Sequence, residues 1–113
     1  MPISRREFAL GFASAAFVLA ARVRARVTER RVYGQGSALP SRELLMRNGI
    51  RPASIRRTQR GVEYLISFDS LEARARAWDR VNTDAEWCEL SAGGVQLQEL
   101  NLYPGGKIFE MSL

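Results

Sequence analysis

The chain has 113 residues, enough for one domain with a single modest hydrophobic core, and its 46% hydrophobic content excludes a disordered tail. The formal charge is +5, but residues 1–25 supply +3 of it, so the remainder lacks the strongly basic balance of a nucleic-acid-binding protein. The chain has no histidine and one cysteine, Cys88, which excludes the commonest general base, the commonest metal ligand and any disulfide within the chain.

The N-terminal residues have the features of an export signal in the usual order. Arg5, Arg6 and Phe8 lie in the sequence S-R-R-E-F-A-L, which resembles the twin-arginine export motif S-R-R-x-F-x-x. Residues 9–21 carry no charge, and this run is too short to span a bilayer but typical of the apolar region of a signal peptide. Small residues then favour cleavage after Ala25.

We therefore divide the chain into a signal peptide, residues 1–25, and an exported domain, residues 26–113. The protein is expected in the periplasm or outside the cell, with membrane contact only through the N-terminal signal. An uncleaved signal would leave a short membrane anchor. The alternative interpretation is a buried or amphipathic N-terminal helix that contains a chance pair of arginines.

Strand and helix signals alternate through the exported domain. The clearest is in residues 61–80, where apolar side chains first alternate, as in a half-buried strand, and then recur at helical spacing. Asp69 or Ser70 is the expected cap of this helix. Its expected apolar face consists of Leu71, Ala75 and Trp78. In chain order, the predicted elements are a strand over 26–33, a helix over 41–47, strands over 53–59 and 61–68, a helix ending near 80, a short helix opened by 83–86, and strands over 95–103 and 107–113.

Apart from the short helix and the last strand, this order is the ferredoxin-like βαββαβ arrangement of an α+β protein, with helices on one face of an antiparallel sheet. In strand 95–103, a change of phase at Leu100 predicts a β-bulge near Glu99. The other face of the sheet also needs cover, because Tyr64 and Leu65 point to opposite faces and both are apolar. We therefore predict a homodimer that buries this face.

Four short motifs follow one another across residues 27–113. They are E-R-R-V-Y at 29–33, N-G-I-R-P at 48–52, F-D-S-L-E-A-R at 68–74, continuing to Trp78, and D-A-E-W at 84–87. Together they resemble the NIPSNAP proteins of the dimeric α+β barrel superfamily, whose D-P-E-W helix start has proline where this chain has Ala85. The resemblance implies a ferredoxin-like fold of the dimeric α+β barrel type and a homodimer. It implies no cofactor and no catalytic residue.

A candidate ligand-binding site lies on the first strand. Glu29, Arg31 and Tyr33 alternate, so they point to the same face of the sheet. If that face lines a cavity, Arg31 would anchor an anionic or carbonyl ligand. Tyr64 and Trp78 are the other candidate ligand-binding residues.

Each candidate also has a structural interpretation. The first-strand cluster would be a solvent-facing strand edge with a cross-strand ion pair to Arg57. Trp78, Trp87 and Tyr64 would be core or rim residues, and Cys88 an inert thiol. A basic cluster around the second strand is interpreted as a solvated hairpin edge rather than a surface for nucleic acid or lipid. It consists of Arg51, Arg56, Arg57 and Arg60.

These features favour a dimeric, non-catalytic module that binds a small ligand or a partner, has no cofactor or metal, and does not bind nucleic acid. The alternative is a small cofactor-independent, monooxygenase-like enzyme of the same superfamily, which the absence of histidine disfavours. Residues 107–113 resemble the opening strand of a further repeat. A fragment of a two-domain protein is therefore a third interpretation.

Overall fold

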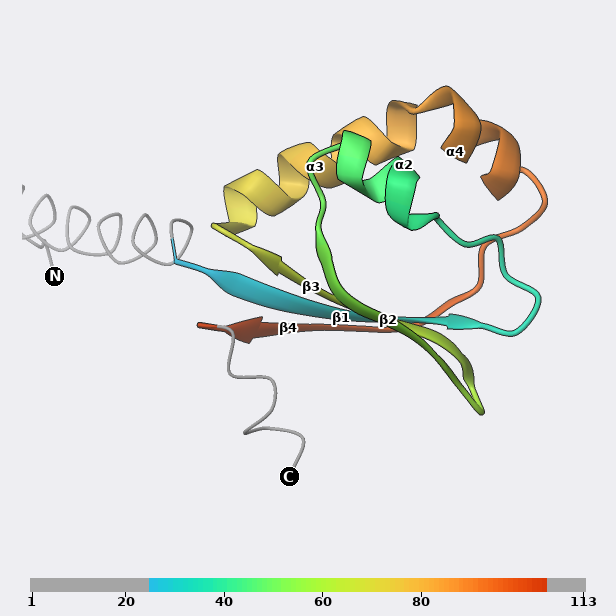
Figure 1. The fold of residues 1–113 in the computed structure, drawn as a ribbon, viewed down its shortest axis with the longest axis horizontal. Coiled ribbons are helices and arrows are strands. Elements are labelled where there is room, and N and C mark those ends of the chain that lie inside the picture. The colour runs from blue at the N-terminus through green and yellow to red at the C-terminus, as the bar shows by residue number, and fades with distance from the viewer. Residues whose placement is uncertain (1–24, 106–113) are drawn as a thin grey trace, which may run out of the picture.

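A computed structural model describes residues 25–105 of the chain (Figure 1). The elements are β1 (Val27–Gly34), α2 (Arg42–Arg47), β2 (Pro52–Thr58), β3 (Gly61–Phe68), α3 (Leu71–Thr83), α4 (Ala85–Ser91) and β4 (Leu97–Pro104). The export motif and the strand predicted over 107–113 lie outside the described residues. Within residues 25–105, no helix combines the length and apolar character needed to cross a membrane.

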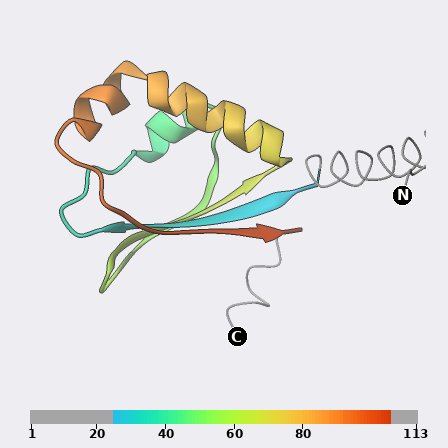
Figure 2. The same cartoon turned by 180° about the vertical axis from the view of Figure 1, so that it is seen from behind.

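The strands form one antiparallel sheet in the order β2-β3-β1-β4. All three helices lie on the same face of this sheet, as the two opposite views show (Figures 1 and 2). Two strand–helix–strand units interleave so that β1 and β3 become the central strands. This is the ferredoxin-like βαββαβ fold of an α+β protein, which confirms the predicted fold class.

The pairing of β1 with β4 is interrupted once. Val32 pairs with Glu99 while the next residue, Tyr33, pairs with Leu97, so Gln98 is an extra residue on β4. Such an insertion bends the strand and shifts its side-chain alternation. The predicted bulge near Glu99 is confirmed, and it explains why the apolar phase of this strand changes at Leu100.

The hydrophobic core lies between the sheet and the helix layer. Val62, Tyr64, Ile66 and Phe68 of β3 are all buried on its helix-facing side, as their alternation predicted. The short helix α2 contributes Leu44 and Leu45, which are completely buried. Ser41 caps the start of this helix, because its side-chain oxygen accepts a hydrogen bond from the amide of Leu44. The core residues are Val27, Tyr33, Leu44, Leu45, Ile50, Val62, Tyr64, Ile66, Phe68, Ala77, Trp78, Val81 and Trp87.

The buried face of α3 differs from the predicted one. Leu71 and Ala75 are exposed, so only Trp78 of the expected face is buried. The buried positions are Ala77, Trp78 and Val81. The helix is rotated so that Arg74 also faces the sheet, where its guanidinium pairs with Glu29. Because a charged residue occupies a core-facing position, the spacing of apolar residues alone does not identify the buried face of α3.

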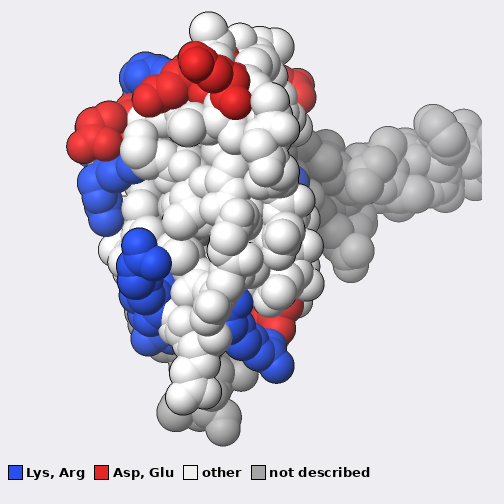
Figure 3. Space-filling model, turned by 90° about the vertical axis from the view of Figure 1, so that its right-hand side faces the viewer, with Lys and Arg blue, Asp and Glu red and all other residues white. Residues whose placement is uncertain are grey.

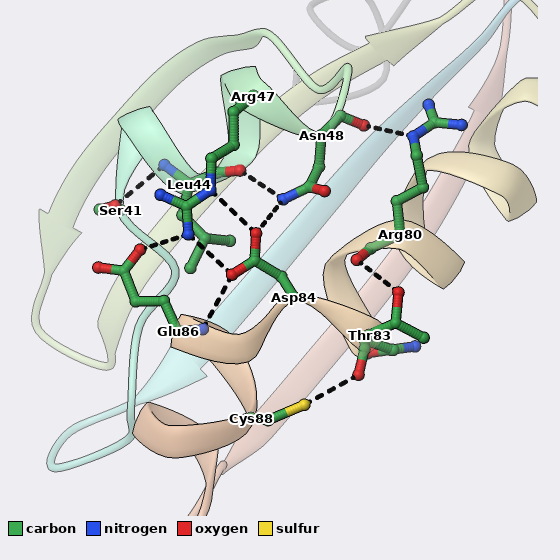
Figure 4. Close-up of polar contacts among 10 residues, drawn as sticks. Ser41, Leu44, Arg47, Asn48, Arg80, Thr83, Asp84, Glu86 and Cys88 are labelled. Carbon is green, nitrogen blue, oxygen red and sulfur yellow. Dashed lines mark hydrogen bonds and ion pairs between the residues drawn. The ribbon is translucent and has the colours of Figure 1, made fainter.

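Asp84 joins the three helices (Figure 4). It caps α4 by accepting a hydrogen bond from the amide of Glu86 at 3.0 Å, and it accepts two from the Arg47 guanidinium at 2.7 and 2.9 Å. The side-chain amide of Asn48 donates a further bond at 2.9 Å. Hydrogen bonding to Arg47, and then to Asn48, holds the pKa of Asp84 well below its usual range. One ionised carboxylate therefore fixes α2 against the junction of α3 and α4.

The sheet face away from the helices carries a ladder of ion pairs across all four strands. Glu63 on β3 pairs with Arg56 on β2 at 2.8 Å and with Arg30 on β1 at 2.7 Å. Arg30 also forms an ion pair with Glu99 on β4, and Glu99 forms a second one with Arg60 from the β2–β3 turn. Hydrogen bonding to Arg30 is the main cause that lowers the pKa of Glu99.

This ladder changes the expectation about the second face. The apolar surface expected around Leu65 is replaced by alternating charges, and Leu65 itself is half-buried. Cross-strand pairs of opposite charge stabilise neighbouring strands without needing an apolar cover. This face of the sheet is therefore more polar than the alternation of Tyr64 and Leu65 indicated.

Charge at one end of the molecule follows the two layers (Figure 3). Most of the acidic side chains in this view lie over the helix layer, and most of the basic side chains lie lower, toward the sheet. The sequence agrees, since α4 contains Glu86 and Glu89 while the β2–β3 hairpin contains Arg57 and Arg60. The basic cluster expected around the second strand is thus partly neutralised by the ion-pair ladder and partly solvated.

Candidate functional site

Three of the predicted site residues, Glu29, Arg31 and Tyr33, project from β1 toward the helices. The Glu29 carboxylate is completely buried and accepts hydrogen bonds from the guanidinium groups of Arg31 and Arg74 and from the indole of Trp78, at 3.0 Å for the indole. An ionised carboxylate is tolerated in a protein interior only when it is paired and hydrogen-bonded. These three donors meet that requirement.

The alternative interpretation of these residues as a solvent-facing strand edge is wrong. The cluster lies under α3, and the second cation comes from Arg74 on that helix rather than from Arg57 on the neighbouring strand. The structure thus brings Trp78 together with the β1 residues, as the candidate site required.

Arg31 is held in one orientation by three neighbours. Its Nε donates to Glu29, its Nη1 donates to the hydroxyl of Tyr33 at 2.7 Å, and the centre of its guanidinium lies 3.8 Å from the ring centroid of Trp78. Stacking of this kind is favourable for a guanidinium that is partly removed from water. Among the described residues, no hydrogen bond engages Nη2 of Arg31, so this nitrogen is a donor available to a ligand.

Tyr33 supplies a second donor at the same place. Burial raises the pKa of its phenol, and the neighbouring charge of Arg31 does not reverse that effect, so the hydroxyl stays protonated at neutral pH. Because the oxygen already accepts a hydrogen bond from Arg31, its own proton is directed elsewhere. Arg31 and Tyr33 therefore present two adjacent donors.

These donors open into a cleft of about 310 Å³ between β1, β4 and helices α3 and α4. The volume is at the lower end of the range for small-molecule sites. Aromatic rings and aliphatic side chains form much of its wall, beside the polar groups. Its lining consists of Arg31, Tyr33, Trp78, Asn82, Trp87, Ser91, Val95 and Leu97.

Tyr64, the remaining predicted site residue, lies on the neighbouring strand β3, where it pairs with Arg31, and it does not line the cleft. Its ring meets that of Tyr33 edge to face with 5.3 Å between the centroids, and its hydroxyl donates to the carbonyl of Pro40 at 2.7 Å. Tyr64 therefore supports the orientation of Tyr33 and does not line the cleft.

Sequence reasoning missed Arg74. The sequence could have indicated it, because Arg74 precedes Trp78 by four residues and the two side chains therefore share one face of the helix. Trp87, interpreted as a core residue, is buried and also lines the cleft. Cys88 on the same helix is exposed and donates to the carbonyl of Asn82, outside the cleft lining.

Metal ligands do not cluster in the part of the chain that the structure describes, since no three acidic or cysteine side chains there are grouped closely enough to hold an ion. The functional groups that line the cleft are a guanidinium, a neutral phenol, two indoles, an amide and a hydroxyl. Such groups can bind and orient an anion with an apolar body.

Comparison with known proteins yields one structural likeness. No family model and no curated protein matches the chain. The structure is similar to the crystal structure of an uncharacterized NIPSNAP-like domain protein from Burkholderia xenovorans. The two chains are 21% identical, the likeness covers 72% of this chain and 84% of that one, and the TM-score is 0.47. The ferredoxin-like assignment rests on the strand order and the one-sided helix layer.

Proposed function

We propose that this protein is a small-ligand-binding module whose cleft takes an amphipathic anion, a carboxylate attached to an apolar or aromatic body. One observation carries the proposal: Arg31, oriented by Glu29 and Trp78, has a free Nη2 within the described residues, beside the Tyr33 hydroxyl. A carboxylate accepts hydrogen bonds from a guanidinium with good geometry. The two indoles beside these donors suit a ring or chain attached to the carboxylate.

The electrostatics of the cluster favour an anion. Glu29 is the only carboxylate that pairs with Arg31 and Arg74 among the described residues, so the three charges leave a formal excess of +1. A neutral Tyr33 adds a donor without adding negative charge. A ligand carboxylate would neutralise this excess in a partly desolvated site, where such interactions are stronger than in water.

Benzoate is expected to quench the intrinsic fluorescence of the full-length chain in a saturable way. Trp78 and Trp87 are the only two tryptophans and both line the cleft, so the signal reports this site directly. Benzamide, which has the same ring without the charge, should bind at least about tenfold more weakly, since hydrogen bonds to a charged group are the stronger ones. Arg31→Gln should weaken benzoate binding by a similar factor.

Arg74→Gln is the matched control for Arg31→Gln. It also removes one positive charge beside Glu29, and with it the formal excess of +1, but Arg74 does not line the cleft and so cannot donate to the ligand. It should therefore weaken benzoate binding less than Arg31→Gln does. Equal weakening in both variants would mean that the cluster acts only through the fold, and saturable quenching by benzamide as strong as that by benzoate would reject an anion site.

The wider setting of the module is also part of the proposal. We infer an exported, NIPSNAP-type protein that is directed by Arg5, Arg6 and Phe8 to the twin-arginine route and that acts as a homodimer. The edge strand β4 supports a dimer, because Leu97, Leu100 and Leu102 on its helix-facing side remain 40–43% exposed. A strand edge can pair with its own copy about a two-fold axis and bury such side chains.

The full-length chain is expected to sediment as a dimer at micromolar concentration, and Leu102→Lys to sediment as a monomer. The added charge would lie inside the paired edge, where it lacks a partner. Leu90→Lys is the control, because Leu90 is as exposed as the β4 leucines but lies on α4. A monomeric wild-type chain, or equal dissociation of both variants, would contradict dimerisation through β4.

A further inference from the structure

We propose that a second cleft, which runs along α3 beside the C-terminal end of α2, binds a phosphate monoester group. This cavity of about 530 Å³ lies where the C-terminal end of α2, helix α3 and the end of β3 come together. It shares no lining residue with the first cleft, which contains Arg31, Trp78 and Trp87. Four arginines from three parts of the chain line it, namely Arg26, Arg51 and, on α3, Arg76 and Arg80.

The charge of this cleft is largely uncompensated. Four arginines face a single lining carboxylate, Asp69, so the lining carries a formal charge of +3. Arg76 also pairs with Glu72 at 2.8 Å on the exposed surface of α3, an arrangement that contributes little and is easily exchanged. Within residues 25–105, neither Arg26 nor Arg51 makes an ion pair with a carboxylate.

One of the four cations is held in place. Arg80 donates from Nε to the carbonyl of Asn48 at 3.2 Å, at the C-terminal end of α2 (Figure 4). Its Nη2 lies only 2.8 Å from where a Cβ on Gly49 would be, so the guanidinium rests directly over a glycine with φ +84°. A cation beside the carbonyl end of a helix is favoured by the helix dipole. Arg80 is exposed, but its contacts with the end of α2 orient its guanidinium.

The shape of the cleft indicates what kind of anion fits. Phe68 and Ala77 are buried beneath the arginines, and Met46 is exposed beside them, so an apolar surface adjoins the charged rim. Several guanidinium groups around one cleft suit a dianion with three terminal oxygens better than a planar carboxylate, since each group can engage an oxygen edge of its own. The structure therefore points to a phosphate monoester with an apolar body.

Isothermal titration of the full-length chain with phenyl phosphate tests this inference. We expect saturable binding that weakens about tenfold in Arg51→Gln and also weakens as salt is raised. Arg57→Gln is the charge-matched control, because Arg57 is exposed, makes no ion pair within the described residues and does not line this cleft. It should bind phenyl phosphate as the wild type does.

A second arm distinguishes a free phosphate ester from a lipid headgroup. Co-sedimentation with vesicles of phosphatidylcholine containing phosphatidic acid is compared with vesicles of phosphatidylcholine alone. Arg51-dependent binding of phenyl phosphate or of phosphatidic acid supports the site and identifies the source. Binding of neither probe, or equal loss in the Arg51 and Arg57 variants, overturns it. Melting curves for both variants confirm that each remains folded.

Discussion

Glu29→Gln is expected to lower the free energy of unfolding by about 3–5 kcal/mol. The wild-type carboxylate is completely buried and accepts hydrogen bonds from two guanidinium groups and the indole of Trp78. Glutamine keeps the shape but not the charge, so two partly buried cations lose their counter-charge. Arg31 and Arg74 are only 15% and 19% exposed, so water cannot replace the lost partner fully.

Urea denaturation of the full-length chain measures this effect, with Glu72→Gln as the control. Glu72 makes the same kind of ion pair with Arg76, but both side chains are about 60% exposed, so its loss should cost under about 1 kcal/mol. The double variant Glu29→Gln/Arg74→Met should recover part of the stability, because it removes one uncompensated cation. Equal effects at Glu29 and Glu72 would show that the buried cluster does not stabilise the fold.

Gly61→Ala is expected to destabilise the protein by more than about 3 kcal/mol. Gly61 begins β3 with φ +147° and pairs with Gly34 at the end of β1. A Cβ at this position would lie 1.9 Å from the carbonyl oxygen of Tyr33. The obstacle is backbone in a central strand, so relief requires the two central strands to separate and disturbs the orientation of Tyr33 in the cleft.

Gly36→Ala separates this steric effect from glycine's general conformational freedom. Gly36 also has positive φ, +82°, but no described atom lies within 4 Å of the position that a Cβ would take, so its replacement should cost only about 1 kcal/mol. The two variants are compared by urea midpoint and by the near-ultraviolet circular dichroism of the aromatic residues. A Gly61→Ala protein as stable as Gly36→Ala would mean that the strands are not so closely apposed.

Local patterns determined most of the fold. The alternation in β3, the cap expected at Asp69 or Ser70 and the helix start at 83–86 indicated the element order and, with it, the ferredoxin-like arrangement. These signals are short-range, because a strand's period and a helix cap depend on residues a few positions apart. Alternation along the first strand likewise predicted that Glu29, Arg31 and Tyr33 lie on one face of it.

Packing between distant elements decided whether that face of the first strand points to the helices or to solvent, and which side chains it contacts. The sequence by itself did not determine that Arg74 turns inward to Glu29, that Arg51 and Arg80 converge on one cleft, or that the second sheet face carries an ion-pair ladder. Apart from the pair of Arg56 with Glu63, these contacts join side chains more than twenty residues apart, and their register follows from the paired strands and the rotation of α3. A charged side chain looks the same in a hydropathy pattern whether it reaches water or a buried partner, and only the tertiary structure distinguishes the two.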